Sequence, residues 1–290
     1  GSPNFSMACN LVGAVTNVVL DYVFVIVLKG GMTGAAVATI IGQILASIMV
    51  IYYMFHYKTV KLEKKHYIPK GKIIGRTVHL GMAQSLNQLA IMIVQIVMNQ
   101  SLTHYGSLSV YGADIPLACT GIVMKVNQVY FSICIGVAQG IQPIASFNRG
   151  AGKNDRVKHT YKLAVTCNTI ISPIAFIIFQ TCPRQIISIF GTGSAEYFKF
   201  SENFFRIFLF MTFANGIQPM SSGFFTSIGK AKLGIVMSLT RQVLFLLPLI
   251  VVFSLIMGID GVMYAGPIAD AAALSLAILF ARRELVAMKK

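Results

Sequence analysis

One carboxylate lies inside an apolar stretch that is long enough to cross a membrane. Asp21 is the only charged residue between Met7 and Leu28. A carboxylate placed in hydrocarbon costs about 2.5 kcal/mol or more, so its side chain is expected to face a polar interior and to belong to an ion or substrate path. Asn17 stands four residues earlier and therefore shares a face of the same helix.

The next apolar stretch supplies a hydroxyl group at a similar depth. Thr39 lies a few residues into that stretch, and Asp21 a few residues before the end of the first. At 1.5 Å per residue, both side chains would lie about 10 Å from the outer ends of two antiparallel helices. Carboxylate, amide and hydroxyl oxygens are ligands for a small cation such as Na⁺, and the carboxylate could instead accept a proton. The alternative is a hydrogen-bond cluster that only joins the two helices.

A second acid and two bases occur in later apolar stretches. Asp270 is near the middle of one, just after Gly266 and Pro267, which loosen a helix. Its carboxylate could meet a cationic substrate or pair with a base. Lys125 and Arg241 are the two candidates for that base, and both interpretations of Asp270 stay open at this point.

The tetrapeptide Gly-Ile-Gln-Pro occurs twice, at 140–143 and at 216–219. Proline inside a membrane span removes a helix hydrogen bond and bends the helix. The repeated motif therefore indicates either a packing feature or a bend beside a cavity. In the second case Gln142 and Gln218 are the side chains that the two motifs would contribute to the cavity.

Composition places the whole chain in a membrane. The chain is 56% hydrophobic and 11% charged with a mean hydropathy of +0.72, whereas soluble domains carry about 25% charged residues. Because about 20 apolar residues span a bilayer, we predict an all-α integral membrane protein with eight transmembrane helices. The predicted spans are 7–28, 33–56, 73–103, 115–142, 160–182, 198–228, 232–257 and 262–281.

The net charge of +15 is distributed unevenly along the chain. Most of the Lys and Arg residues follow the second, fourth, sixth and eighth predicted spans, as in 57–72 and 146–162. The positive-inside rule then places both chain ends in the cytoplasm, with the protein in the plasma (inner) membrane. The basic charge is thus a topology signal, and no basic patch interleaved with aromatic residues indicates nucleic-acid binding.

A short repeat indicates that the spans belong to a larger, two-lobed arrangement. Gly31-Met-Thr-Gly34 and Gly258-Ile-Asp-Gly261 each connect two predicted spans on the outer side. Parallel repeats of this kind are a common transporter design. We therefore expect residues 1–56 to be the last two helices of a first lobe, 57–72 a basic linker, and 73–290 a complete six-helix second lobe, with four further helices before the first.

Motifs for covalent chemistry are missing from the sequence. It contains no GxSxG, no Walker A and no HExxH pattern. Its five cysteines show no CxxC spacing and are better explained by packing. We therefore expect no enzyme activity, no cofactor and no metal other than a coupling ion. Any uphill transport would be driven by an ion gradient.

Several motifs together resemble the MATE (multidrug and toxic compound extrusion) transporters, most closely the bacterial MepA-like and DinF-like branch. The stretch from Asn17 to Asp21, followed by 31–39, is similar to the fifth and sixth helices of that family. Residues 140–152 with Arg156 resemble its eighth helix and the following basic loop. The later helix junctions are matched by Ser227-Ile-Gly-Lys-Ala-Lys232 and Gly258-Ile-Asp-Gly261.

The resemblance implies a twelve-helix exporter of two six-helix lobes around a central cavity, of which this chain holds helices five to twelve. Asn17, Asp21 and Thr39 match residues of the N-lobe cation site, which in relatives also uses an acid from the first helix. The NorM-like branch has acids in its seventh and tenth helices. Here the seventh has none and the tenth carries Asn215, which shifts the expected cation site to the N-lobe.

The expected function is therefore export of amphipathic, mostly cationic drugs and toxic compounds by alternating access, in antiport with Na⁺ or H⁺. The protein would act as a monomer in the lipid bilayer, with small organic cations as its partners. The candidate cavity residues are Asp270, Lys125, Arg241, Asn215, Gln142 and Gln218. The alternatives are a flippase for lipid-linked precursors, which predicts a cavity rich in Arg and Lys, and an inactive fragment or membrane scaffold.

Overall fold

The computed structural model describes residues 3–56, 70–191 and 193–287, and every regular element in them is a helix. The predicted basic linker 57–72 falls mostly outside the described residues. The chain divides into two compact units, Gly1–Ile74 and Gly75–Lys290.

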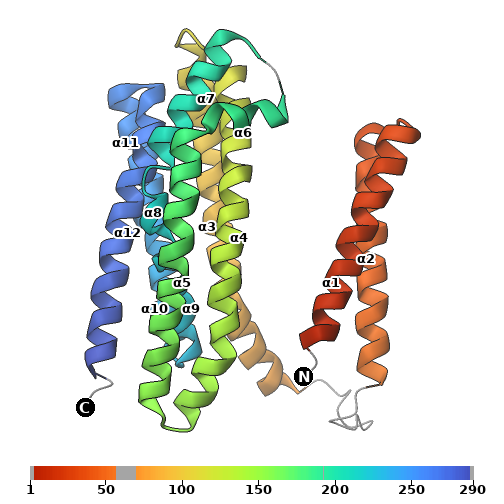
Figure 1. Cartoon of the computed structure of the whole chain (residues 1–290), viewed down its shortest axis with the longest axis vertical. Helices are drawn as coiled ribbons and strands as arrows, with labels where there is room; N and C mark the ends of the chain where they lie inside the picture. The colour runs from red at the N-terminus through yellow and green to blue at the C-terminus, as the bar shows by residue number, and fades with distance from the viewer. Residues whose placement is uncertain (1–2, 57–69, 192, 288–290) are drawn as a thin grey trace. The chain divides into compact units, whose positions relative to one another are not determined.

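The first unit is a hairpin of two long helices (Figure 1). Helix α1 (Pro3–Asp21) continues into a π-helical segment, η1 (Tyr22–Val27), and α2 (Gly31–Phe55) runs back beside it. The turn between them contains Lys29 and Gly31, which have φ angles of 51° and 54°. Glycine adopts this left-handed conformation without a steric penalty, so the sharp reversal of the chain is favoured there.

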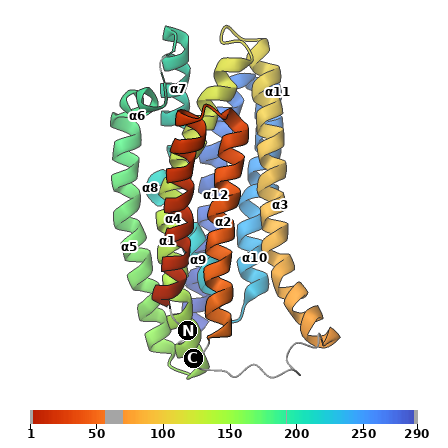
Figure 2. The ribbon, with the colours of Figure 1, turned by 90° about the vertical axis from the view of Figure 1, so that its right-hand side faces the viewer.

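The second unit is a bundle whose long helices, among them α3, α4, α5 and α12, run along its long axis (Figures 1 and 2). In chain order its elements are α3 (Gly71–Ser107), α4 (Asp114–Gly150), α5 (Asn154–Thr181), α6 (Pro183–Phe190), α7 (Ala195–Phe208), α8 (Thr212–Asn215), α9 (Ile217–Ser227), α10 (Ala231–Leu239), the π-helical η3 (Thr240–Leu246), α11 (Leu247–Met257) and α12 (Ile259–Ala287).

Six helical stretches of the described chain are long and apolar enough to cross a membrane: Asn4–Val27, Gly31–Phe55, Asp114–Gly150, Asn154–Thr181, Lys232–Met257 and Ile259–Ala287. Each overlaps one of the predicted spans, although the stretch that begins at Asp114 continues well beyond its predicted end at 142. The other two predictions, 73–103 and 198–228, fall on α3 and on the run from α7 to α9. The α7–α9 run is interrupted between Phe208 and Ile217. The sequence pattern predicted one continuous helix over 198–228, whereas the structure has a broken one.

Buried polar side chains donate hydrogen bonds to backbone carbonyl oxygens where that helix is broken. The hydroxyl of Tyr130 lies 2.8 Å from Ser172 Oγ and donates to the carbonyl oxygen of Thr212 at 3.0 Å. The amide of Asn168 donates to the carbonyl oxygen of Gly216 at 2.9 Å. Because backbone groups inside a membrane protein need internal partners, these contacts stabilise the interruption.

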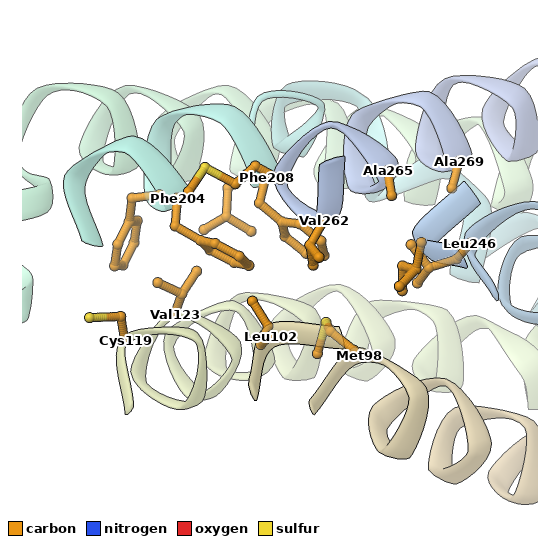
Figure 3. Packing of buried hydrophobic residues seen from close by; sticks show 14 of the residues in the cluster. Met98, Leu102, Cys119, Val123, Phe204, Phe208, Leu246, Val262, Ala265 and Ala269 are labelled. Atoms are coloured by element: carbon orange, nitrogen blue, oxygen red, sulfur yellow. The ribbon is translucent and has the colours of Figure 1, made fainter. Parts of the chain in front are cut away.

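The apolar core of the second unit holds α3, α7 and α12 together (Figure 3). The rings of Phe204 and Phe208 stack with centroids 5.0 Å apart on α7. They belong to the same buried cluster as Met98 of α3 and Val262 of α12. Met98 and Phe208 also line a cavity in this unit, so the core fixes one wall of the polar site described next.

Candidate functional site

Asp21 occupies the last position of α1, where the chain passes from α-helix to π-helix. Its Oδ1 atom is buried and has no hydrogen-bond partner among the described residues. Burying a polar atom without a partner is unfavourable, and π-helical turns frequently occur at functional sites. Asp21 therefore presents a buried carboxylate oxygen that is free of partners within the described chain.

Asn17 and Thr39 are joined across the hairpin, whereas counting residues from the turn predicts Thr39 opposite Asp21, one helical turn nearer the outer end of the helix. The Asn17 amide nitrogen donates to Thr39 Oγ1 at 3.3 Å, and Thr39 Oγ1 in turn donates to the carbonyl oxygen of Ala35 at 2.9 Å. Because the hydroxyl proton of Thr39 is already used, Asn17 must present its NH₂ group to that oxygen. The amide oxygen of Asn17 then remains an acceptor on the helix face shared with Asp21.

Close packing of glycines brings α1 and α2 near enough for this contact. A Cβ atom added to Gly42 would lie 2.7 Å from the backbone oxygen of Gly13 and 3.2 Å from the Cβ of Asn17. Small residues of this kind let membrane helices approach closely. The position of Asn17 relative to Thr39 thus depends on the absence of a side chain at Gly42.

We expect Gly42→Ala to force the two helices apart, because the atom that its methyl group meets belongs to the backbone. Overpacking of this kind typically costs about 1–3 kcal/mol, which would appear as a lower thermal unfolding midpoint of the purified protein. Gly136→Ala is the matched control, because Gly136 is an exposed residue within α4 with nothing within 4 Å of its Cβ position. Equal midpoints for the two variants would contradict the tight contact.

The second unit has an open cavity of about 430 Å³ between α3, α4, α9 and the α10–η3 segment. Apolar parts of its wall come from Met98, Met124, Phe131 and Phe208. The polar parts are mostly side-chain amides, which both donate and accept hydrogen bonds. These amides are Asn87, Gln95, Asn127, Gln128, Gln139, Gln142, Gln218 and Gln242.

Helical spacing explains how so many amides reach one cavity. On α4, Asn127 and Gln128 are followed about three turns later by Gln139 and about four turns later by Gln142, so all four lie on one side of the helix. The sequence reasoning missed this face, although the signal was present as amides recurring at helical spacing. The hydroxyl of Ser238 on α10 also donates to Asn87 Oδ1 on α3 at 2.6 Å, which links two walls of the cavity.

A buried ion pair stands at the wall of this cavity. Arg241 Nε donates to Asp270 Oδ1 at 2.6 Å, and Asn215 Nδ2 donates to Asp270 Oδ2 at 2.5 Å. The side chains of Arg241 and Asp270 are only 13% and 4% exposed. Arg241 lines the cavity, with its Cζ 5.7 Å from the centroid of the Phe131 ring, whereas Asp270 and Asn215 are not among the lining residues.

The remaining sequence candidates divide between two places. Gln142 and Gln218 line the polar cavity, and the Gln218 amide donates to the carbonyl oxygen of Met237 at 3.3 Å. Lys125 is exposed and lines a different, apolar pocket of about 480 Å³ between α4 and α5. Of the two bases that the sequence offered to Asp270, Arg241 is therefore the partner.

The π-helical segment η3 carries Arg241 and Gln242 into the cavity wall. It ends just before Pro248, which is the second residue of α11. Proline has no N–H group to bond to the carbonyl four residues earlier, and π-bulges are one of the recognised ways in which a helix accommodates such a defect. The segment packs against α12, which bears Asp270.

These features define a class of protein: a multi-pass helical membrane protein whose second unit holds a polar cavity between its helices, as membrane transporters do. The family model for MatE matches residues 84–270. The chain belongs to the MatE family, and the resemblance to MATE transporters noted from the sequence is confirmed.

Curated relatives include multidrug export proteins named MepA. The MepA of Staphylococcus aureus (strain bovine RF122 / ET3-1) is 22% identical over 271 residues, which cover 93% of this chain and 58% of the relative. The MepA of Staphylococcus haemolyticus (strain JCSC1435) is 22% identical over 293 residues, covering 100% of this chain and 63% of the relative. The chain thus spans less than two thirds of the length of these relatives.

Solved structures share the fold. A crystal structure of MATE in the straight conformation superposes with a TM-score of 0.86 at 19% identity, covering 100% of this chain and 64% of that one. A MOP superfamily transporter from Pyrococcus furiosus, described as having a binding pocket of reverse polarity, gives a TM-score of 0.85 at 19% identity over 98% of this chain and 63% of that one.

Proposed function

We propose that this chain forms eight membrane spans, corresponding to helices five to twelve of a twelve-helix, two-lobed transporter. Its first unit would complete an N-lobe and its second unit would be the C-lobe. The nearly full coverage of this chain, against 63–64% coverage of the solved structures, supports this assignment. The distribution of Lys and Arg supports placing both chain ends in the cytoplasm. We also propose that the protein acts as a monomer in the plasma membrane.

We further propose that the transporter exports amphipathic organic compounds in exchange for Na⁺ or H⁺. The observation that carries this proposal is the buried Oδ1 of Asp21, which has no partner in the described chain and lies on the face of Asn17. An ion or proton that binds this carboxylate more tightly in one conformation shifts the population toward that conformation. Rocking of the lobes between inward-open and outward-open forms would then release the substrate outside.

The cavity of the second unit suits amphipathic substrates. Its Met and Phe side chains offer adaptable apolar surface, and its amides offer hydrogen bonds. A flippase for pyrophosphate-linked lipids would need several cationic side chains. Arg241 is the one charged residue in the described lining of this cavity, which favours drug export over the flippase alternative.

The decisive experiment follows efflux of ethidium, a fluorescent organic cation, from cells that express the transporter containing this chain. The Na⁺ gradient and the pH gradient are collapsed first separately and then together. We expect efflux above that of cells lacking the transporter, and we expect it to stop when one of the two gradients is removed, which identifies the coupling ion. Efflux that persists after both gradients are collapsed would refute ion-coupled antiport, as would the absence of any efflux.

A further inference from the structure

The guanidinium group of Arg241 has hydrogen-bonding capacity that the protein does not use. Arginine carries five N–H donors in a planar fork. In the described part of the chain only Nε has an acceptor, which is Asp270 Oδ1 at 2.6 Å. Because the side chain lines the cavity, the four N–H groups of its terminal nitrogens are left for a molecule inside that cavity.

Asp270 does not offer a cation site to the same molecule. One of its oxygens accepts from Arg241 and the other from Asn215, and its side chain is 4% exposed. It is also absent from the residues that line the cavity. A ligand in the cavity can therefore contact the terminal N–H groups of Arg241. The carboxylate of Asp270, which balances the charge of Arg241, is not part of the cavity lining.

We propose that Arg241 forms a carboxylate subsite in the cavity of the second unit. The terminal nitrogens of an arginine match the two oxygens of a carboxylate in a bidentate pair. Among the described residues that line the cavity, Arg241 alone is cationic, which suits a group with a single negative charge better than a phosphate with two. The subsite selects amphiphiles that carry a carboxylate, including zwitterions whose cationic group lies away from Arg241.

The surroundings of Arg241 are arranged to hold such a group. Phe131 lies 5.7 Å from the Arg241 Cζ and restrains the guanidinium by a cation–π contact. Amides of Gln218 and Gln242 line the same cavity and supply neutral hydrogen-bond donors, and Met98 and Met124 offer apolar surface to the rest of the ligand. The volume of about 430 Å³ is within the range of small-molecule sites.

The test uses two probes that differ only in the carboxylate. The fluorescent acid 7-(diethylamino)coumarin-3-carboxylate and its ethyl ester are titrated against the purified protein in detergent, with no ion gradient present. We expect the wild-type protein to bind the acid about tenfold more tightly than the ester, because a charge-assisted bidentate pair is lost in the ester. Equal affinity for acid and ester would overturn the proposal.

Three variants separate a carboxylate subsite from a purely structural ion pair. Arg241→Gln is expected to abolish the preference for the acid, so that acid and ester bind with equal affinity. Asp270→Asn is expected to strengthen acid binding, because it removes the negative charge that competes with the ligand for the guanidinium. Lys125→Gln removes a positive charge outside the cavity and is expected to leave the preference intact. Weaker acid binding in Asp270→Asn, or equal losses in Arg241→Gln and Lys125→Gln, would contradict the subsite.

If Arg241→Gln does not fold, Arg241→Lys replaces it, since lysine keeps the charge and loses the planar fork. The acid preference is then expected to fall several-fold, and an unchanged preference would contradict bidentate recognition. The proposal rests on the proposed function, because it narrows the substrates of the same transporter. The two fail separately, however: the gradient experiment follows a cation that has no carboxylate, and the binding experiment needs no gradient.

Discussion

Asp21→Asn is expected to abolish gradient-driven efflux while leaving the protein folded in the membrane. The two side chains have the same shape, and the buried Oδ1 of Asp21 has no hydrogen bond within the described residues that the change could break. A neutral amide, however, neither takes up a proton at physiological pH nor offers a full negative charge to Na⁺. The loss of a coupling free energy of about 1–3 kcal/mol lowers the ion-dependent change in substrate affinity about 5- to 150-fold.

The measurement compares ethidium efflux at equal abundance of the two proteins in the membrane. Asp260→Asn is the control, because Asp260 is an exposed acid in the first turn of α12, and we expect it to have no effect. Asn17→Ala should lower the apparent affinity for the ion without abolishing efflux, because the carboxylate is retained. Normal efflux by Asp21→Asn would show that Asp21 serves only the packing of the hairpin.

Asp270→Ala is expected to destabilise the second unit strongly. Removing one partner of a buried ion pair leaves the other charge uncompensated, which typically costs about 3–5 kcal/mol. Here the change would leave Arg241, 13% exposed, without its acceptor, and would also leave the amide of Asn215 without one. The effect should appear as a lower midpoint of thermal unfolding in mild detergent.

A double variant that removes both charges distinguishes the ion pair from simple loss of volume. Arg241→Met combined with Asp270→Leu removes both charges and keeps apolar bulk, and we expect it to be far more stable than Asp270→Ala. The coumarin carboxylate should also raise the unfolding midpoint of Asp270→Ala more than that of the wild-type protein. Midpoints of the double variant at or below that of Asp270→Ala would show that the pair is not the source of the loss.

The approximate depth of a side chain along its helix could be predicted from the sequence, whereas the direction in which it points around the helix axis could not. Counting residues from the short turn placed Thr39 near the depth of Asp21, and in the structure Thr39 is bonded to Asn17, one helical turn away from Asp21 on the same helix. Asp270 had two bases at plausible depths. The side chain of Lys125 lines a pocket between α4 and α5, whereas Arg241 reaches Asp270 from a π-helical segment. Hydropathy does not indicate which of these two bases points toward Asp270.

The broken helix and the amide cavity illustrate the same limit. The interruption between α7 and α9 depends on partners far away in the chain, Tyr130 and Asn168, which satisfy its backbone. A local sequence pattern cannot identify hydrogen-bond partners that lie so far away in the chain. The two Gly-Ile-Gln-Pro motifs, by contrast, were visible in the sequence, and each contributes a glutamine to the cavity, Gln142 and Gln218. The other amides of the α4 face, Asn127, Gln128 and Gln139, carry no such motif, and only the fold places them in the same cavity.

The π-helical segment η3 has an evolutionary consequence. Its hydrogen bonds run to the fifth residue rather than the fourth, so it accommodates one residue more than an α-helix over the same rise. A residue added to a regular helix turns everything beyond it by about 100°, whereas here the extra residue is confined to Thr240–Leu246. Relatives in which this stretch is α-helical should be one residue shorter before Pro248, with a different side chain opposite Asp270. A single inserted codon would then separate transporters that can hold a carboxylate in this cavity from those that cannot.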